Sequence, residues 1–255
     1  MTYLRSFAEY LGGNSLLAGQ TLKELFKKPY YPGLIIEQIY QIGLKSLPLV
    51  IVVTGSTGMV MALQFGDGLE KFGGKLYVPK IVSLSMVREL GPVLACLMIA
   101  ARIGAGITSE IGAMRTSQQI DAIRALGTSP IKKIVIPRLL AGLIAIPLLS
   151  TLSVIIGVMG GLLVGQLDLG LDYMFYWQKV MDTVKLKDFY SGVGKSFFFA
   201  VFITMTACYY GLTAKGGTRG VGLATTKSVV VSSILIMIGD YFLTKLFLLV
   251  ERWPL

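Results

Sequence analysis

The feature that most restricts the fold of this chain is a run of 29 residues without a charge, from Leu139 to Leu167. A helix needs about 20 mostly apolar residues to cross the hydrocarbon core of a bilayer. Two more uncharged runs are long enough, Ser46–Gly66 and Ser196–Ala214. Residues 81–101 and 226–250 are similarly apolar but contain charged groups. The sequence therefore predicts an all-α membrane protein with five transmembrane helices.

The composition supports this class and excludes much enzyme chemistry. The chain is 54% hydrophobic and only 15% charged, whereas soluble domains carry about 25% charged residues. It contains no histidine, which excludes a Ser-His-Asp triad and His-ligated zinc. Its two cysteines, Cys96 and Cys208, lie in apolar runs and cannot form a four-cysteine site. No metal site, no cofactor and no catalytic residue is expected on this chain.

The distribution of basic residues predicts the orientation. The segment 102–138 holds six basic and two acidic residues, and residues 215–227 hold three basic and no acidic ones. By contrast, residues 168–195 hold four lysines and four aspartates. Because cytoplasmic loops carry the excess of Lys and Arg, the N-terminus is predicted inside and the C-terminus outside. The net charge of +10 is thus interpreted as a topology signal and not as a nucleic-acid interface.

Residues 1–35 differ from the five-span domain predicted for residues 36–255. They contain no apolar run of 18 residues, and Pro29 and Pro32 end the segment. We expect an amphipathic helix in the cytoplasmic membrane interface; a frayed tail is the alternative. The expectation rests on a mixture of apolar and basic side chains: Leu4, Phe7, Leu11, Leu17, Leu22, Leu25 and Phe26 with Arg5, Lys23, Lys27 and Lys28.

A short amphipathic helix is predicted at about 116–126, inside the basic loop. Thr116 and Gln119 have the spacing of a capping box, and Gly127 is a typical C-terminal stop. Ile120, Ile123 and Leu126 form one apolar stripe. Such a helix either docks a cytoplasmic partner or packs against the chain's own helix ends.

Ionisable residues within the spans are the second functional signal. A charged group at bilayer depth is costly and usually faces a cavity or a partner. Arg88 and Glu89 lie in the second span and Asp240 in the fifth. Adjacent residues point about 100° apart on a helix, so Arg88 and Glu89 need not pair with each other. The charged residues of the spans form either a polar patch that meets a charged head group or structural ion pairs within the bundle. Lys195 lies at the outer end of the fourth span, where its side chain could instead extend to the membrane surface (snorkel).

Three glycines, Gly157, Gly161 and Gly165, form two overlapping G-x-x-x-G units in the third span. Small residues at this spacing let helix backbones approach closely. The seam serves either a dimer interface or packing within one chain.

Several short motifs extend this interpretation. They are Arg88-Glu89-Leu90-Gly91-Pro92-Val93, Ala101-Arg102-Ile103-Gly104, Ser109-Glu110-Ile111-Gly112-Ala113-Met114-Arg115, Gln119-Ile120-Asp121-Ala122, Ala224-Thr225-Thr226-Lys227 and Asp240-Tyr241-Phe242. In order and spacing they resemble the MlaE/YrbE-type permeases over most of the chain beyond residue 35. One departure is Lys227, where some relatives have Arg.

The resemblance implies a permease subunit of an ABC transporter that moves phospholipids between the inner and outer membranes of bacteria and maintains outer-membrane lipid asymmetry. Such permeases are homodimers in the inner membrane. A separate cytoplasmic ATPase binds the ATP and Mg, and a periplasmic MCE-domain protein exchanges the lipid; a STAS-domain protein is a further candidate partner.

The resemblance also implies roles for particular residues. Arg88 and Glu89 match a pair beside the lipid cavity, and Lys195 and Asp240 fall near it. Met61 and Phe72 align as acyl-chain or rim contacts. The 116–126 helix matches the coupling helix that seats in the ATPase, with these candidate contacts: Arg115, Gln119, Ile120, Asp121, Ile123 and Arg124.

Two other classes of protein are alternatives. An ion-coupled secondary transporter of an amphipathic substrate is suggested by Glu89 and Asp240, but such proteins usually show paired repeats with interrupted helices. A membrane-embedded lipid-modifying enzyme would need a nucleophile or metal cluster, and the sequence offers neither.

Overall fold

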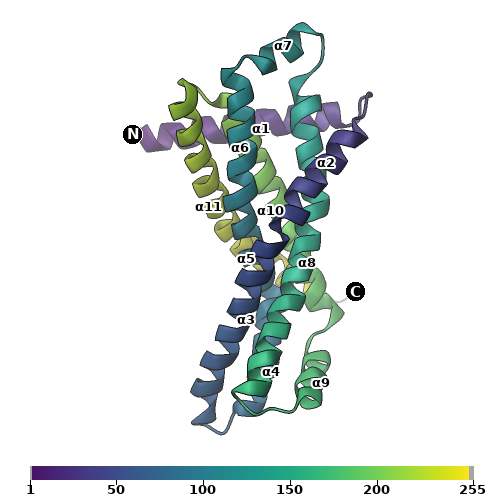
Figure 1. The fold of residues 1–255 in the computed structure, drawn as a ribbon, viewed down its shortest axis with the longest axis vertical. Helices are drawn as coiled ribbons and strands as arrows, with labels where there is room; N and C mark the ends of the chain where they lie inside the picture. Colours follow the sequence, from purple (N-terminus) through teal and green to yellow (C-terminus); the bar gives the residue numbers. More distant parts are fainter. Residues whose placement is uncertain (1, 253–255) are drawn as a thin grey trace. The chain divides into compact units, whose positions relative to one another are not determined.

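The computed structural model describes residues 2–252, and the side chains of residues 9–250. All regular elements in this part of the chain are helical (Figure 1). In this part of the chain, three π turns interrupt the longer helices: Met86–Leu90, Ala100–Gly104 and Ile131–Val135. Of the residues expected to make the N-terminal helix amphipathic, Leu4, Arg5 and Phe7 have side chains outside the described range. The α-helices are α1 Thr2–Leu25, α2 Pro32–Ile42, α3 Leu47–Glu70, α4 Val78–Ser85, α5 Gly91–Ile99, α6 Ala105–Thr116, α7 Gln119–Ala125, α8 Ile136–Leu167, α9 Tyr173–Thr183, α10 Leu186–Thr213 and α11 Gly217–Arg252.

Five helical stretches within residues 2–252 are long and apolar enough to cross a membrane, which confirms the predicted number of spans. Each predicted run overlaps one of them, and the helices extend beyond the apolar runs. The first stretch begins at Pro32, because a proline at the first helical position loses no hydrogen bond there. The stretches are Pro32–Glu70, Lys75–Thr116, Ile131–Leu167, Leu186–Thr213 and Gly217–Val250.

The chain divides into two compact units, and three of the long helices (α8, α10 and α11) contribute to both. The first unit comprises Met1–Leu44, Ile99–Ala145 and Ala200–Ile236. The second comprises Lys45–Met98, Ile146–Phe199 and Met237–Leu255.

In the first unit, α1 is anchored by one buried face. The hydroxyl oxygens of Tyr10 and Thr206 lie 2.7 Å apart, and the Tyr10 ring stacks on the Tyr210 ring. Burial raises the pKa of Tyr10. Leu17 and Thr21 are buried on the same helix. The helix therefore has a packed face, while a set of leucines remains exposed: Leu11, Leu16 and Leu22.

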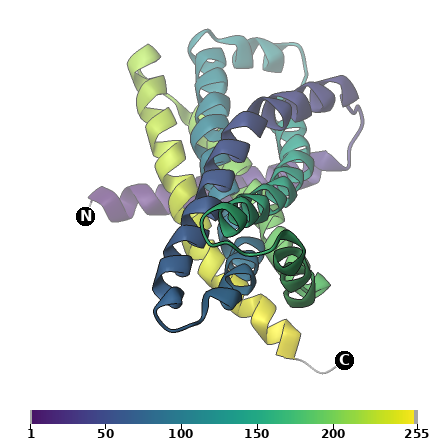
Figure 2. The ribbon, with the colours of Figure 1, turned by 60° about the horizontal axis from the view of Figure 1, so that its bottom comes forward.

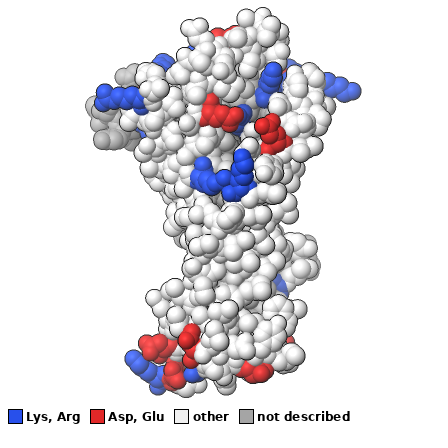
Figure 3. Space-filling model, viewed as in Figure 1, with Lys and Arg blue, Asp and Glu red and all other residues white. Residues whose placement is uncertain are grey.

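In the second unit, α4 contacts both α3 and α9 (Figure 1). α9 lies beside the last turns of α8, because the Tyr176 ring packs against Gly165 (Figure 2). Burial raises the pKa of Tyr176. Charged side chains gather at the turn between α3 and α4, and the surface of the neighbouring helices of this unit is largely uncharged (Figure 3). This is the surface expected of helices that lie in lipid.

The glycines of α8 are used for packing inside the chain. A side chain at Gly157 would collide with Met86, and one at Gly165 would meet the Tyr176 ring at 2.7 Å. A side chain at Gly161 would meet Tyr176 and Val82, each at 2.8 Å. The alternatives left open for the G-x-x-x-G seam are therefore resolved in favour of packing within the chain.

Candidate functional site

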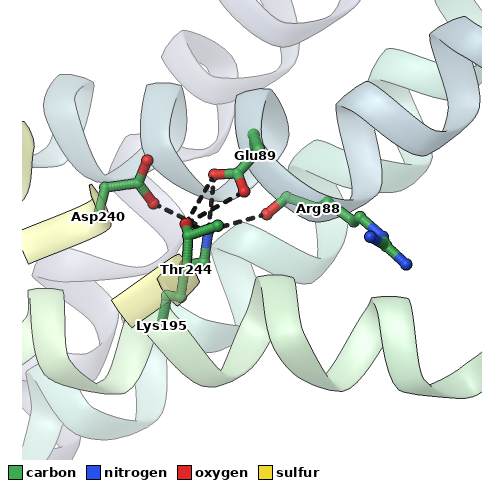
Figure 4. A network of polar contacts seen from close by, with 5 residues as sticks. All are labelled: Arg88, Glu89, Lys195, Asp240 and Thr244. Atoms are coloured by element: carbon green, nitrogen blue, oxygen red, sulfur yellow. Dashed lines mark hydrogen bonds and ion pairs between the residues drawn. The ribbon is translucent and has the colours of Figure 1, made fainter. Parts of the chain in front are cut away.

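The second membrane span leaves α-helical geometry where its charged pair lies. In the π turn Met86–Leu90, the Gly91 N–H bonds to the Met86 carbonyl, five residues back. Pro92 has no N–H with which to bond the Arg88 carbonyl, four residues back. That carbonyl instead accepts a hydrogen bond from Lys195 Nζ at 3.3 Å (Figure 4).

Lys195, on α10, is the centre of a buried ion network. Its side chain is 0% exposed. Nζ lies 2.6 Å from Glu89 Oε2, 3.0 Å from Asp240 Oδ1 and 2.6 Å from Thr244 Oγ1 (Figure 4). Two carboxylates compensate the cost of placing an ammonium in a membrane span. The snorkelling alternative for Lys195 is wrong, because the ammonium is enclosed by these partners.

Thr244 belongs to the network although the sequence did not single it out. Its hydroxyl donates to Glu89 Oε1 at 3.2 Å while it accepts from Lys195. Thr244 follows Asp240 by four residues on α11, so both side chains lie on one helix face. This i, i+4 spacing from Asp240 is the feature of the sequence from which Thr244 could have been predicted as a site residue.

Arg88 points to a different partner. Two of its guanidinium nitrogens donate to Asp188 Oδ1, with Nε at 2.7 Å. The other oxygen, Asp188 Oδ2, accepts the Lys185 N–H at 2.8 Å, so Asp188 satisfies a free backbone donor at the start of α10. The separate directions expected for Arg88 and Glu89 are therefore present, and Asp188 is a site residue that sequence reasoning missed.

Within this unit, the Arg88–Asp188 pair and the Lys195 network together contain three carboxylates and two basic groups. The carboxylates are Glu89, Asp188 and Asp240, and the basic groups are Arg88 and Lys195. If all are ionised, one negative charge is in excess. In the described part of the chain, no group of three or more His, Cys, Asp or Glu side chains is arranged to hold a metal ion.

Arg88 and Glu89 also line a cavity of about 520 Å³. Most of its wall is apolar, and Lys80 adds a third charged group that the sequence had not indicated. The lining residues are Leu69, Tyr77, Lys80, Ile81, Leu84, Ser85, Arg88 and Glu89. The arrangement can accept an amphipathic molecule with an anionic group.

Met61 and Phe72 lie outside the lining of this cavity. Met61 packs against the apolar core of the unit, and Phe72 is 86% exposed just after α3. Their roles as acyl-chain or rim contacts stay predictions.

The helix in the basic loop begins later than predicted. α6 continues through Thr116, whose hydroxyl donates to the Ala113 carbonyl, and the chain reverses at Gln118 with φ of 61°. The predicted capping box of Thr116 and Gln119 is therefore wrong, because Thr116 is the end of one helix and not the start of the next. The stop at Gly127 is confirmed: its φ is 73° and its N–H bonds to the Arg124 carbonyl.

α7 presents a charged surface. Asp121 accepts hydrogen bonds from Arg115 at 2.9 Å and from Arg124 at 3.2 Å. Ile120 is buried, whereas Leu126, at the end of the predicted apolar stripe, is 81% exposed. Gln119 is exposed and Ile123 half-buried.

Five apolar helical stretches in the described part of the chain, with an ion network beside a cavity, define a multi-pass membrane protein. The model of the family described as Permease MlaE matches residues 35–246. A "Probable ABC transporter permease protein" of Rickettsia felis is 42% identical over 241 residues, which cover 94% of this chain and 93% of that one. The "Intermembrane phospholipid transport system permease protein MlaE" of Haemophilus influenzae is 33% identical, over 86% of this chain and 84% of its own. The chain belongs to the MlaE permease family, and it is a multi-pass membrane permease.

A plant relative extends the similarity beyond bacteria. "Protein TRIGALACTOSYLDIACYLGLYCEROL 1, chloroplastic" of Arabidopsis thaliana is 29% identical over 232 residues, covering 91% of this chain and 66% of that protein.

Proposed function

We propose that this permease moves phospholipid between the inner and outer membranes of a bacterium as part of an ATP-driven transporter. The supporting observation is that Arg88 and Glu89 line a largely apolar cavity. The guanidinium of Arg88 has five N–H donors, and Asp188 occupies two of them. The remaining donors suit a lipid phosphate, and the apolar wall suits acyl chains.

We infer that the chain lies in the inner membrane with its N-terminus inside and its C-terminus outside. The basic segments 102–138 and 215–227 support this orientation. The exposed leucines of α1 support its placement in the cytoplasmic interface. The charged cavity then lies toward the outer leaflet, because it is lined from the end of α3 and the start of the second span.

Energy is supplied by other chains in this proposal. Two permease copies form a homodimer, and a cytoplasmic ATPase that binds ATP and Mg seats on α7. Closure of the ATPase moves α7 and changes the shape of the cavity. A periplasmic MCE-domain protein then exchanges lipid with it, and a STAS-domain protein is a further candidate partner.

Removal of the Arg88 charge tests the lipid site. In Arg88→Gln/Asp188→Asn both members of the ion pair are neutral, so no buried carboxylate is left unpaired. We expect phospholipid transfer between vesicles to fall at least tenfold, since a charge-assisted hydrogen bond contributes about 1.5–3 kcal/mol. Glu70→Gln/Lys75→Gln removes an ion pair at the turn after α3, outside the cavity lining, and is the matched control. Unchanged transfer contradicts the proposal, and transfer without any ATPase favours an ion-coupled secondary transporter.

Reversal of one charge on α7 tests the coupling contact. Arg124→Glu is expected to lower the recovery of the ATPase with the tagged permease several-fold. α7 itself stays folded, because Asp121 keeps its contact with Arg115. Co-purification from native membranes, quantified by mass spectrometry, measures the effect. Lys215→Glu reverses an exposed charge in the other basic loop and is the control; equal recovery from both variants removes α7 from the interface.

A further inference from the structure

A second cavity, of about 940 Å³, lies in the same unit and shares no lining residue with the charged one. It is a groove among α3, α8 and α9, and none of its lining side chains is a carboxylate, lysine or arginine. Its floor is formed where Gly55 and Gly160 meet: a side chain at Gly160 would collide with the Gly55 carbonyl. The two glycines let the backbones of α3 and α8 touch, and this contact closes the groove on its inner side.

The groove has a polar end and an apolar end. Gly58 packs on Gly157 and Gly66 on Leu169, so α3 and α8 run parallel. Ile51 and Val52, at the start of α3, therefore lie at one end of the groove. Gln166, Tyr173 and Trp177, from the last turn of α8 and the start of α9, lie at the other.

Side chains of this kind match an amphipathic molecule in a fixed orientation. Tyr and Trp are enriched where a membrane meets water, because their rings are apolar and their N–H and O–H groups are polar. Tyr173 and Trp177 are 50% and 41% exposed. Three methionines (Met59, Met159 and Met181) line the wall, and their flexible side chains adapt to irregular apolar ligands.

We propose that this groove is a phospholipid-binding site. The acyl chains lie along α3 and α8, and the head group lies beside Gln166, Tyr173 and Trp177. It goes beyond the proposed transport cavity, since it is a separate site that takes lipid directly from the surrounding bilayer. The absence of lysine and arginine from its lining predicts that it does not select anionic head groups. In the orientation proposed above, its polar end lies at the outer leaflet.

Trp177 provides a direct probe of occupancy. The chain has two tryptophans, and Trp253→Phe leaves Trp177 alone. The full-length protein in detergent is titrated with phosphatidylcholine brominated near the head-group end of one acyl chain, the part placed beside Trp177, because bromine quenches tryptophan only at short range. We expect quenching that saturates at about one lipid per chain.

A variant whose groove is filled by a larger side chain tests whether the quenching comes from lipid in the groove. Ser56 is an exposed residue of the lining, so Ser56→Phe fills the groove without entering the core; the half-quenching lipid concentration is expected to rise at least tenfold. Val60→Phe, one turn along α3 and outside the lining, is the matched control and should leave it unchanged.

Three results would overturn the site. Quenching that rises without saturation and is equal in all variants shows ordinary solvation by lipid. An equal loss in Val60→Phe shows a general perturbation of α3. Saturable quenching in the chain alone that disappears in the purified multi-subunit transporter shows that a partner's transmembrane helix fills the groove. None of these depends on transport through the charged cavity, so the two proposals fail separately.

Discussion

Lys195→Met is expected to lower the free energy of unfolding by about 3 kcal/mol, because it leaves Glu89 and Asp240 without their shared cation. This is the lower end of the usual 3–5 kcal/mol for a broken buried pair. The Glu89 side chain is 37% exposed, so part of its charge remains solvated. Thermal unfolding of the purified protein in detergent measures the loss.

A charge-balanced variant separates stability from transport. Lys195→Met/Glu89→Gln/Asp240→Asn removes the cation and both carboxylates together. We expect it to recover most of the lost stability, since replacing a buried ion network by neutral groups is often tolerated. Phospholipid transfer should remain low if the charges act on the lipid. Normal transfer by this variant would limit the network to a structural role.

Gly58→Ala is expected to destabilise the protein by about 3 kcal/mol, the upper end of the range for overpacking. The added Cβ would overlap the backbone carbonyl of Gly157. A backbone cannot rotate aside as a side chain can, so α3 and α8 must separate. The yield of folded protein and its thermal unfolding in detergent report the effect.

A second glycine of the same helix is the control. Gly68 has open space where a Cβ would be. Gly68→Ala should therefore be neutral or stabilise by up to about 1 kcal/mol, through helix propensity alone. Equal behaviour of the two variants would show that the contact of α3 with α8 is loose.

The spans were predictable because a membrane imposes a simple condition on sequence. Long uncharged runs such as Leu139–Leu167 have few structural solutions, and each overlaps an observed helix. Charged residues inside such runs are rare enough to be noticed singly. This is why Arg88, Glu89 and Asp240 were found without knowledge of their partners.

The partners were less predictable, because they are distant in sequence. Asp188 lies 100 residues from Arg88, in a segment of mixed charge (168–195) where nothing in the sequence distinguishes it from the other aspartates. The predicted capping box at Thr116 was wrong because the spacing of Thr116 and Gln119 does not reveal where the preceding helix ends. In the structure Thr116 is still the last residue of α6. The role of the glycine seam could not be predicted, because it depends on where Met86 and Tyr176 lie in space. The spacing of the glycines does not specify these positions.

The π turns have a consequence for how the second span is probed. Each adds a residue to a helical turn, so the residues that follow are rotated by about 100° relative to a regular helix. Met86–Leu90 and Ala100–Gly104 therefore divide Lys75–Thr116 into three segments with separate angular phases. A single helical wheel for this span assigns the wrong faces beyond Leu90. Cysteine pairs for cross-linking must be chosen separately for α4, α5 and α6.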